Sequence, residues 1–328
     1  MAHSLDFKTK KSLGQNFLND ANTIEEIANV SGATKDDVVV EIGPGLGALT
    51  EELSKRAGKV IAVELDDRLI PILRAKFLTL GNVEIVHEDI LKYDWSTAAA
   101  MRRPTEFCGA VEETQDRDAN CDFGAESNTV AEAQREAAQP LRSGGDVAAA
   151  ETSSDGSSLL PPLRIVGNLP YYITTPILLG ILEKKVPAKN ITVMVQKEVA
   201  DRIVAKPGGK DYGVLSISLQ YYCECRKAID VPREYFSPAP NVDSAVVVME
   251  LKTGRSLDEK EEEIFFALVK KAFSQRRKTL LNSLDGFRGL NKTDINNLLN
   301  KYEISAQQRA ETLSVEQYIA LSKEIKNA

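Results

Sequence analysis

The chain has 328 residues, long enough for one large and one smaller domain or for two similar domains, and its 43% hydrophobic and 27% charged residues are typical of a globular protein. No stretch approaches the roughly 18 apolar residues of a membrane span, and the N-terminus has no secretory signal, so we expect a cytoplasmic protein. The four cysteines form no CxxC pair and there are only two histidines, which argues against a metal site.

The net charge of −7 disfavours a nucleic-acid partner at first sight, but the charge is unevenly distributed. Residues 97–162 contain five arginines, no lysine and twelve acidic residues, so this segment accounts for the whole net charge. The rest of the chain is neutral overall and has local basic clusters. An RNA partner therefore remains compatible with the composition.

Helix and strand patterns alternate from residue 20 onward. They predict a helix over residues 20–31, capped by Asp20, and strands over residues 38–42, 59–64 and 82–86. Gly43 and Gly45 follow the first strand in a glycine-rich turn that opens a helix, as in the first βα unit of a doubly wound sheet. Such glycines let the backbone approach a ligand, and the helix N-terminus favours an electron-rich group.

Acidic residues follow the next two predicted strands. Glu64 ends the second strand, where a carboxylate accepts hydrogen bonds from both hydroxyls of an adenosine ribose. Asp89 follows the third strand and is placed to accept from an adenine amino group, while Ile90 can pack on the ring. The glycine turn and Glu64 alone also fit a nicotinamide dinucleotide enzyme, because the spacing from Gly43 to Ala48 matches its relaxed fingerprint.

A fourth apolar run leads directly into Asn168, Leu169, Pro170 and Tyr171. An amino group on a nucleobase is a poor nucleophile because its lone pair is delocalised into the ring. The amide oxygen of Asn168 and the carbonyl of Leu169 could each accept a hydrogen bond from one N–H of this amino group and so localise the lone pair. Pro170 restricts the backbone that aims this carbonyl, and Tyr171 could stack on the base, as enzymes acting on flipped bases require.

Taken alone, these four residues could equally be a strand end followed by an ordinary proline turn. Their position after the fourth strand, together with the acid after the third strand, favours S-adenosylmethionine over a dinucleotide as the ligand.

Residues 97–162 do not continue the α/β pattern. They lack Lys, Ile, Tyr and Trp and contain runs of alanine with clusters of glycine, serine and aspartate. Because little apolar surface is available to offset the cost of ordering this segment, we predict a disordered insertion with a transient helix at 129–139. An ordered domain is the alternative.

Beyond the Asn-Leu-Pro-Tyr motif, the patterns predict a helix over 175–184 and strands over 191–196, 214–225 and 244–251, the last two as an antiparallel pair. A proline-stiffened loop between these two strands would present Phe236, which could sandwich a base against Tyr171. Residues from 258 onward show only helical patterns. The prediction is a seven-stranded α/β Rossmann-like domain, residues 1–253, followed by a small all-helical domain, residues 254–328.

Two basic clusters are candidates for contacts with RNA phosphates. One follows the strand predicted at 191–196 and surrounds Pro207-Gly208-Gly209, and the other lies on and after a C-terminal helix. Ordinary solvated surface charge is the alternative for both. The candidate residues are Lys197, Arg202, Lys206, Lys210, Arg276, Arg277 and Lys278.

These motifs together resemble the ribosomal RNA adenine dimethylases. The matching stretches cover the chain except for residues 97–162, and they are residues 14–18, 41–47, 63–64, 88–90, 168–176, 196–202, 236–246, 273–278 and 309–314. The resemblance implies a class I S-adenosylmethionine-dependent methyltransferase fold and dimethylation of N6 on two adjacent adenosines in the 3′-terminal hairpin of small-subunit rRNA. It also implies action on the immature small subunit during late assembly, without a metal. The insertion departs from the family, which has a short helical link there.

The resemblance also assigns roles to individual residues. It implies that Asn168 and Leu169 orient the target amine and that Tyr171 and Phe236 stack on the adenine. With the glycine-turn and strand-end positions above, the expected cofactor-binding residues are Asn16, Leu18, Gly43, Gly45, Glu64, Asp89, Ile90 and Asn168. A methylase of large-subunit rRNA and an assembly checkpoint factor are the alternatives, and we expect a monomer.

Overall fold

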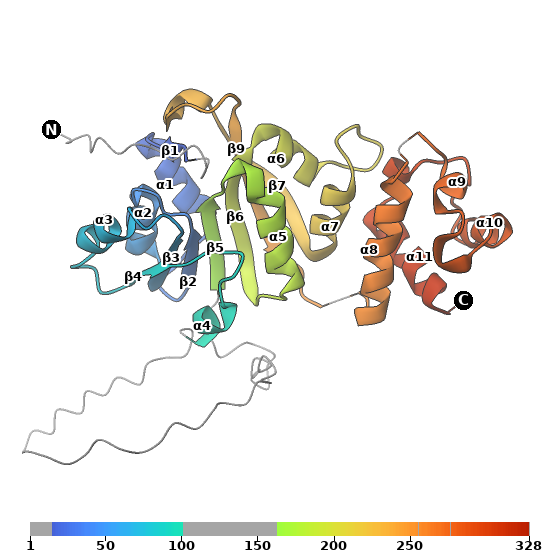
Figure 1. Cartoon of the computed structure of the whole chain (residues 1–328), viewed down its shortest axis with the longest axis horizontal. Helices are drawn as coiled ribbons and strands as arrows, with labels where there is room; N and C mark the ends of the chain where they lie inside the picture. Colours follow the sequence, from blue (N-terminus) through green and yellow to red (C-terminus); the bar gives the residue numbers. More distant parts are fainter. Residues whose placement is uncertain (1–14, 101–162, 255, 276, 328) are drawn as a thin grey trace, which may run out of the picture. The chain divides into compact units, whose positions relative to one another are not determined.

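Seven strands form one mixed sheet in the order β4-β3-β2-β5-β6-β9-β7 (Figure 1). A computed structural model describes residues 15–100, 163–254, 256–275 and 277–327, and the statements below concern these residues. Strands β4 to β6 in this order run parallel, and β9 is antiparallel to both of its neighbours. The strands are β2 (Val38–Ile42), β3 (Lys59–Glu64), β4 (Val83–His87), β5 (Leu163–Asn168), β6 (Ala188–Gln196), β7 (Cys223–Val231) and β9 (Ser244–Leu251).

The predicted fold class, the number of strands and the antiparallel last pair are therefore confirmed. The strand predicted at 191–196 begins three residues earlier, at Ala188. Strands such as β2 are buried along their whole length because helices cover both faces of the sheet.

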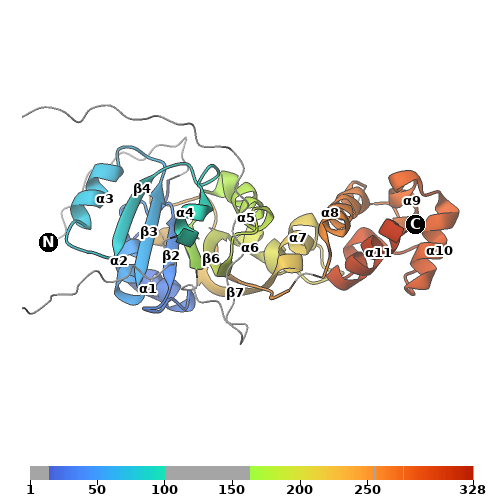
Figure 2. The same ribbon diagram turned by 90° about the horizontal axis from the view of Figure 1, so that it is seen from below.

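Apolar side chains of α1 (Ala21–Val30) and α2 (Ala48–Arg56) pack on one face of the sheet. Those of α5 (Thr174–Glu183) and α6 (Lys197–Val204) pack on the other. Figure 2 shows strands β2 and β3 between these layers. On the first face, α3 (Ile70–Lys76) adds Leu73 against β4.

Helix α4 (Trp95–Ala100) corrects the predicted start of the insertion. Residues 97–100 belong to this helix, and Ala98 is fully buried in the core of the sheet. The described fold therefore extends four residues into the segment predicted to be disordered. The rest of that segment, including the helix predicted at 129–139, lies outside the described residues.

The segment predicted as a strand at 214–225 is mainly a helix, α7 (Val214–Tyr222), and β7 begins only at Cys223. The apolar residues of α7 alternate along the sequence, as in a strand, but they pack into two different hydrophobic cores. Leu215 and Leu219 pack into the core of the sheet, whereas Ile217 and Tyr221 pack into a core formed with the C-terminal helices. Burial on opposite faces produces the same alternation as a strand, and this explains the wrong prediction.

The C-terminal part is helical throughout its described residues, as predicted. It contains α8 (Glu259–Phe273), α9 (Leu280–Leu284), α10 (Lys292–Lys301), α11 (Val315–Asn327) and the 3₁₀ turns η4 (Phe287–Gly289) and η5 (Ala310–Thr312). Asp258 and Asn291 begin α8 and α10 with capping boxes. The described residues form one compact unit, so the boundary near 253–256 remains a prediction.

A second, two-stranded sheet was not predicted. Strand β1 (Phe17–Leu18) pairs antiparallel with β8 (Phe236–Ser237), and Asn19 N–H donates to the Tyr235 carbonyl at 2.8 Å. This pairing brings residues 15–19, which we call the N-terminal arm, beside the proline-rich loop that follows β8.

Candidate active site

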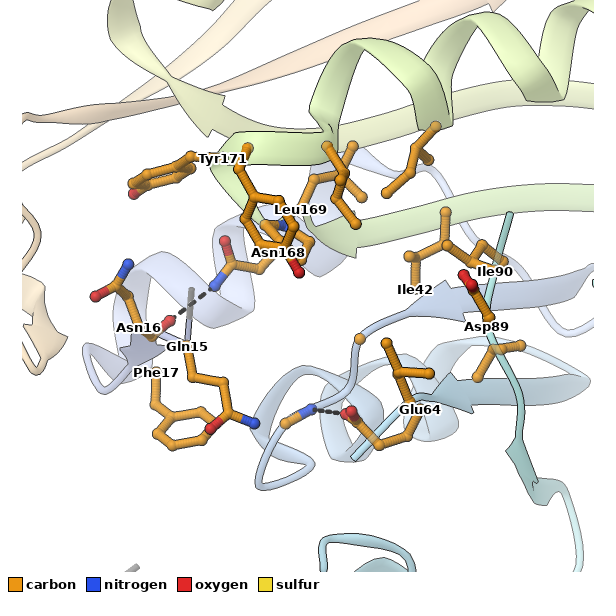
Figure 3. Close-up of a pocket in the computed structure, with 18 of the residues that line it drawn as sticks. Gln15, Asn16, Phe17, Ile42, Glu64, Asp89, Ile90, Asn168, Leu169 and Tyr171 are labelled. Carbon is orange, nitrogen blue, oxygen red and sulfur yellow. Dashed lines mark hydrogen bonds between the residues drawn. The ribbon is translucent and has the colours of Figure 1, made fainter. Parts of the chain in front are cut away.

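A cavity with about 810 Å³ of empty space, part of it open to solvent, lies at the carboxyl ends of β2 to β5. Doubly wound sheets bind their ligands at this edge. Figure 3 shows Asn168 and Tyr171 on one side of the cavity and Glu64 and Asp89 on the opposite side. Nine of the predicted residues line it: Asn16, Gly43, Gly45, Glu64, Asp89, Ile90, Asn168, Leu169 and Tyr171.

The glycine turn needs its glycines for two separate reasons. Gly43 and Gly45 have φ angles of 66° and 58°, in the left-handed region that other residues rarely adopt. A Cβ atom on Gly45 would also lie 3.0 Å from the ring of Phe17. The N-terminal arm therefore packs directly on the turn.

Glu64 is held by two backbone donors. Its Oε2 accepts from Gly45 N–H at 3.2 Å, and its Oε1 accepts from Asp66 N–H at 2.8 Å. The residue is only 6% exposed, and burial raises the pKa of this carboxyl above its usual range. A fixed carboxyl that needs further polar partners suits a ligand with hydroxyl groups.

Asp89 and Ile90 follow β4 and are half-buried at the edge of the cavity. Asp89 Oδ1 accepts from Leu91 N–H at 3.0 Å, which fixes the carboxylate. Figure 3 shows Asp89 and Ile90 near Ile42, so a polar and an apolar group adjoin, as a flat heterocycle requires.

Asn168 and Leu169 are anchored to different neighbours. Asn168 Nδ2 donates to the Asn16 carbonyl at 3.0 Å, and this bond holds the amide by its nitrogen end (Figure 3). Leu169 N–H donates to the Met194 carbonyl of β6 at 3.1 Å, and its side chain is 1% exposed. The strand end therefore presents both residues in a fixed arrangement.

Two tyrosines follow in the 3₁₀ turn η2 (Tyr171–Ile173). The Tyr171 hydroxyl lies 2.6 Å from Ser244 Oγ, and burial raises the pKa of this phenol. Tyr172 also lines the cavity and is 57% exposed. Sequence reasoning missed Tyr172, although it adjoins the motif.

Phe236 does not occupy the predicted exposed position. Its ring is 5% exposed and packs in the core with Ile27 and Val246, and it does not line the cavity. Pairing of β8 with β1 draws this residue inward, because Phe236 lies opposite Leu18. Its stacking role remains a prediction.

A second cavity shares Gly43, Gly45 and Asn168 with the first and is also lined by Leu18 and Glu41. Glu41 is 1% exposed, and its Oε2 has no hydrogen-bond partner in the described part of the chain. Burial raises the pKa of Glu41 to about 7. Glu41 lies within the strand predicted at 38–42, and no sequence signal marks it as a site residue.

The two basic clusters flank one stretch of chain. Gly208 N–H donates to the Glu311 carbonyl at 2.7 Å, and Leu280 N–H donates to the Gln308 carbonyl at 2.8 Å. Arg309 lies between these acceptors and is exposed, but the sequence analysis did not select it for RNA. The exposed predicted residues are Lys197, Arg202, Lys206, Lys210, Arg277 and Lys278, whereas Arg276 lies outside the described residues.

Lys197 is apart from this group and lies 3.6 Å from Asp230 as an ion pair. Across the described ranges, no group of three or more His, Cys, Asp or Glu side chains could hold a metal ion. Nor does any helix described here have the length and apolarity to cross a membrane.

The sheet order, the glycine turn, the acids after β3 and β4, and the Asn-Leu-Pro-Tyr motif define the class of S-adenosylmethionine-dependent methyltransferases. Two solved structures share the fold. A dimethyladenosine transferase from Plasmodium falciparum gives a TM-score of 0.68 at 20% identity, covering 95% of this chain and 98% of that one. The 23S rRNA methyltransferase ErmE gives a TM-score of 0.62 at 24% identity, and the match covers 95% of this chain and 100% of that one.

A model of the ribosomal RNA adenine dimethylase family matches residues 6–327, and the chain belongs to this family. A protein of Clostridioides difficile is 42% identical over 97% of this chain and 91% of its own length. A protein of Bacillus licheniformis is 39% identical over 98% of this chain and 92% of its own length. Both are named ribosomal RNA small subunit methyltransferase A.

Proposed function

We propose that this enzyme transfers methyl groups from S-adenosylmethionine to N6 of two adjacent adenosines in the 3′-terminal hairpin of small-subunit rRNA, during late subunit assembly in the cytoplasm. The observation that carries the proposal is the fixed pair Asn168 and Leu169 at the end of β5, beside the cavity that contains Glu64. Family membership and the names of the relatives support the rRNA substrate.

The residues present fit the cofactor. The Glu64 carboxyl would accept from the ribose hydroxyls, Asp89 would accept from the adenine amino group, and Ile90 would pack on the ring. The glycine turn leaves no side chain in the way, and the expected contacts Asn16 and Leu18 lie in the N-terminal arm beside it. When bound, S-adenosylmethionine supplies an electrophilic methyl group.

The chain's own residues would prepare the nucleophile. Asn168 Oδ1 and the Leu169 carbonyl each accept a hydrogen bond from one N–H of the adenine amino group. These two bonds localise the nitrogen lone pair. Since Asn16 holds the nitrogen end of the Asn168 amide, the oxygen end is oriented before the base arrives. Tyr171 stacks on the base, so that positioning and electrostatics supply the rate.

We also propose that residues 254–328 and the loop at 206–210 bind RNA, whereas the rest of the 1–253 region binds the cofactor and performs the transfer. The support is the convergence of both basic clusters on residues 308–311, where exposed Arg309 adds a further positive charge. Phosphate contacts of this kind fix the register of an RNA without reading its sequence. The expected partner is the immature small subunit, bound by a monomer.

The test uses labelled S-adenosylmethionine with separate undermethylated small and large ribosomal subunits, followed by chromatography of the digested nucleosides. We expect label in N6,N6-dimethyladenosine from the small subunit alone. Label from the large subunit would assign the chain to a methylase of that subunit instead. Cofactor binding without label in either subunit would leave only a role as an assembly checkpoint factor.

A further inference from the structure

Asp66 lies two residues beyond Glu64, in the turn after β3, and is 1% exposed. Its Oδ2 accepts from Gln15 Nε2 at 2.8 Å, and its backbone N–H donates to Glu64 Oε1 at 2.8 Å. Glu64 in turn accepts from Gly45 N–H. One hydrogen-bonded chain thus runs from the N-terminal arm through Asp66 and Glu64 to the glycine turn.

Arg68 keeps this acceptor charged. Its Nε donates to Asp66 Oδ1 at 2.9 Å and its Nη2 to Oδ2 at 2.5 Å, a two-point contact with one carboxylate. The Arg68 guanidinium holds the pKa of Asp66 well below its usual range, so the carboxylate is ionised at neutral pH. A hydrogen bond to an ionised acceptor is stronger than one between neutral groups, so Gln15 is held firmly.

The next two residues of the arm are anchored to the strand end of β5 and to the glycine turn. The Asn16 carbonyl accepts from Asn168, and Phe17 lies against the glycine turn at Gly45. Figure 3 shows Gln15, Asn16 and Phe17 together on the side of the cavity opposite Asp89 and Ile90. The arm therefore closes one side of the cavity, and its first two residues are held by Asp66 and Asn168, whereas residues 17–19 are held by β8.

We propose that Asp66 is a positioning residue for the cofactor, because its side chain fastens the arm while its backbone N–H orients the Glu64 carboxyl. Asp66 does not line the cavity itself, so its side chain acts through Gln15, and a substitution leaves the backbone bond to Glu64 in place. The inference rests on the proposed function in one respect, that S-adenosylmethionine occupies the cavity. Loss of Asp66 then weakens cofactor binding although no direct contact is removed.

A double-mutant cycle tests this with calorimetric titration of S-adenosylmethionine into the full-length protein and its variants Gln15→Ala, Asp66→Ala and the double variant. We expect each single substitution to weaken binding about tenfold, the value of one charge-assisted hydrogen bond. The double variant should bind no more weakly than Asp66→Ala. Effects that multiply would show that the two residues act independently and would overturn the proposal.

Two further variants separate positioning from folding. Asp66→Asn keeps an oxygen acceptor for Gln15 and should restore most of the affinity lost in Asp66→Ala, and the Michaelis constant for the cofactor should follow the same order. Asp67→Ala removes the same charge at an exposed neighbour and should bind normally. If Asp66→Ala fails to fold, Gln15→Ala in the half-buried arm decides alone, and normal affinity there contradicts the role of Asp66. Absence of binding by the unmodified protein would contradict the proposed function instead.

Discussion

Under the proposed function the cavity has two halves, a cofactor half and a base half, which differ in how completely they are assembled. In the cofactor half, formed by the glycine turn, Glu64 and Asp89, each acidic side chain already accepts hydrogen bonds from the backbone. In the base half, formed by residues 168–171, the strand end is fixed, but Tyr171 and Phe236, the two aromatic groups proposed to stack on the base, are engaged elsewhere. Tyr171 is bonded to Ser244, and Phe236 is buried in the core.

This difference indicates which half of the cavity must rearrange when its ligand binds. We expect the cofactor half to bind its ligand without rearrangement, because Glu64 and Asp89 each accept from a backbone N–H two residues further along the chain. Stacking of Phe236 on a base requires its ring to leave the core around Ile27. Residues of the base half should therefore affect the transfer step, whereas those of the cofactor half should affect affinity and stability.

The largest effect is expected for Asn168→Ala, which removes the amide acceptor of the base half. Methylation of undermethylated small subunits should fall by up to about 1,000-fold, the loss seen when one preorganised polar group is removed from a reacting centre. Cofactor affinity, measured by calorimetry on the same variant, should change far less. Methylation at the normal rate would refute the role of Asn168, and an equal loss of cofactor affinity would remove the distinction between the halves.

Glu41→Gln tests the buried acid beneath the cofactor half. The folded-state pKa of about 7 exceeds the usual value of 4.5, so the folded protein retains a proton that the unfolded chain loses, and wild-type stability falls as pH rises from 4.5 to 7. The substitution removes this titration. Its free energy of unfolding relative to wild type should therefore increase by about 3 kcal/mol between pH 4.5 and pH 8.

Denaturant unfolding at both pH values measures this difference. Glu84→Gln is a control, because Glu84 is partly exposed and pairs with Lys59 at the surface. A constant stability difference between the Glu41→Gln variant and the wild type across this range would show that Glu41 titrates normally in the folded protein.

Glu64→Ala should weaken S-adenosylmethionine binding about 30-fold, because two ribose hydroxyls lose the carboxyl that accepts their hydrogen bonds. The fold should persist, since burial of this carboxyl already disfavours its charged form. Calorimetric titration measures the affinity. Unchanged affinity would refute the assignment of Glu64 to the ribose, even if methylation were slower.

Sequence patterns placed the glycine turn, Glu64 and Asp89 around one cavity because the determinants of that placement are local. The glycines, Glu64 and Asp89 follow consecutive parallel strands, and strands of this kind end at one edge of a sheet. The Asn-Leu-Pro-Tyr motif was located for the same reason, since β5 lies beside β2.

The errors arise where distant contacts decide the outcome. Phe236 was expected at the surface because its loop is rich in proline, but pairing with Leu18, more than 200 residues earlier, buries it. Helix α7 was predicted as a strand because it is buried on two opposite faces. The second face contacts the C-terminal helices, the first of which begins at Glu259. The hydrogen bond between Gln15 and Asp66 likewise joins residues whose proximity no periodicity indicates.

The smallest effect is expected for Ser244→Ala, which removes the partner of the Tyr171 hydroxyl. Ser244 is fully buried at the start of β9, so its Oγ fixes the ring of Tyr171 without facing the cavity. The transfer rate should fall about fivefold, corresponding to one ordinary hydrogen bond, while cofactor affinity stays normal. Tyr171→Phe removes the same bond and keeps the ring, so it should match Ser244→Ala, and the double variant should be no slower. A double variant with multiplied losses would mean that the Tyr171 hydroxyl has a second task in the base half, beyond holding its ring in place.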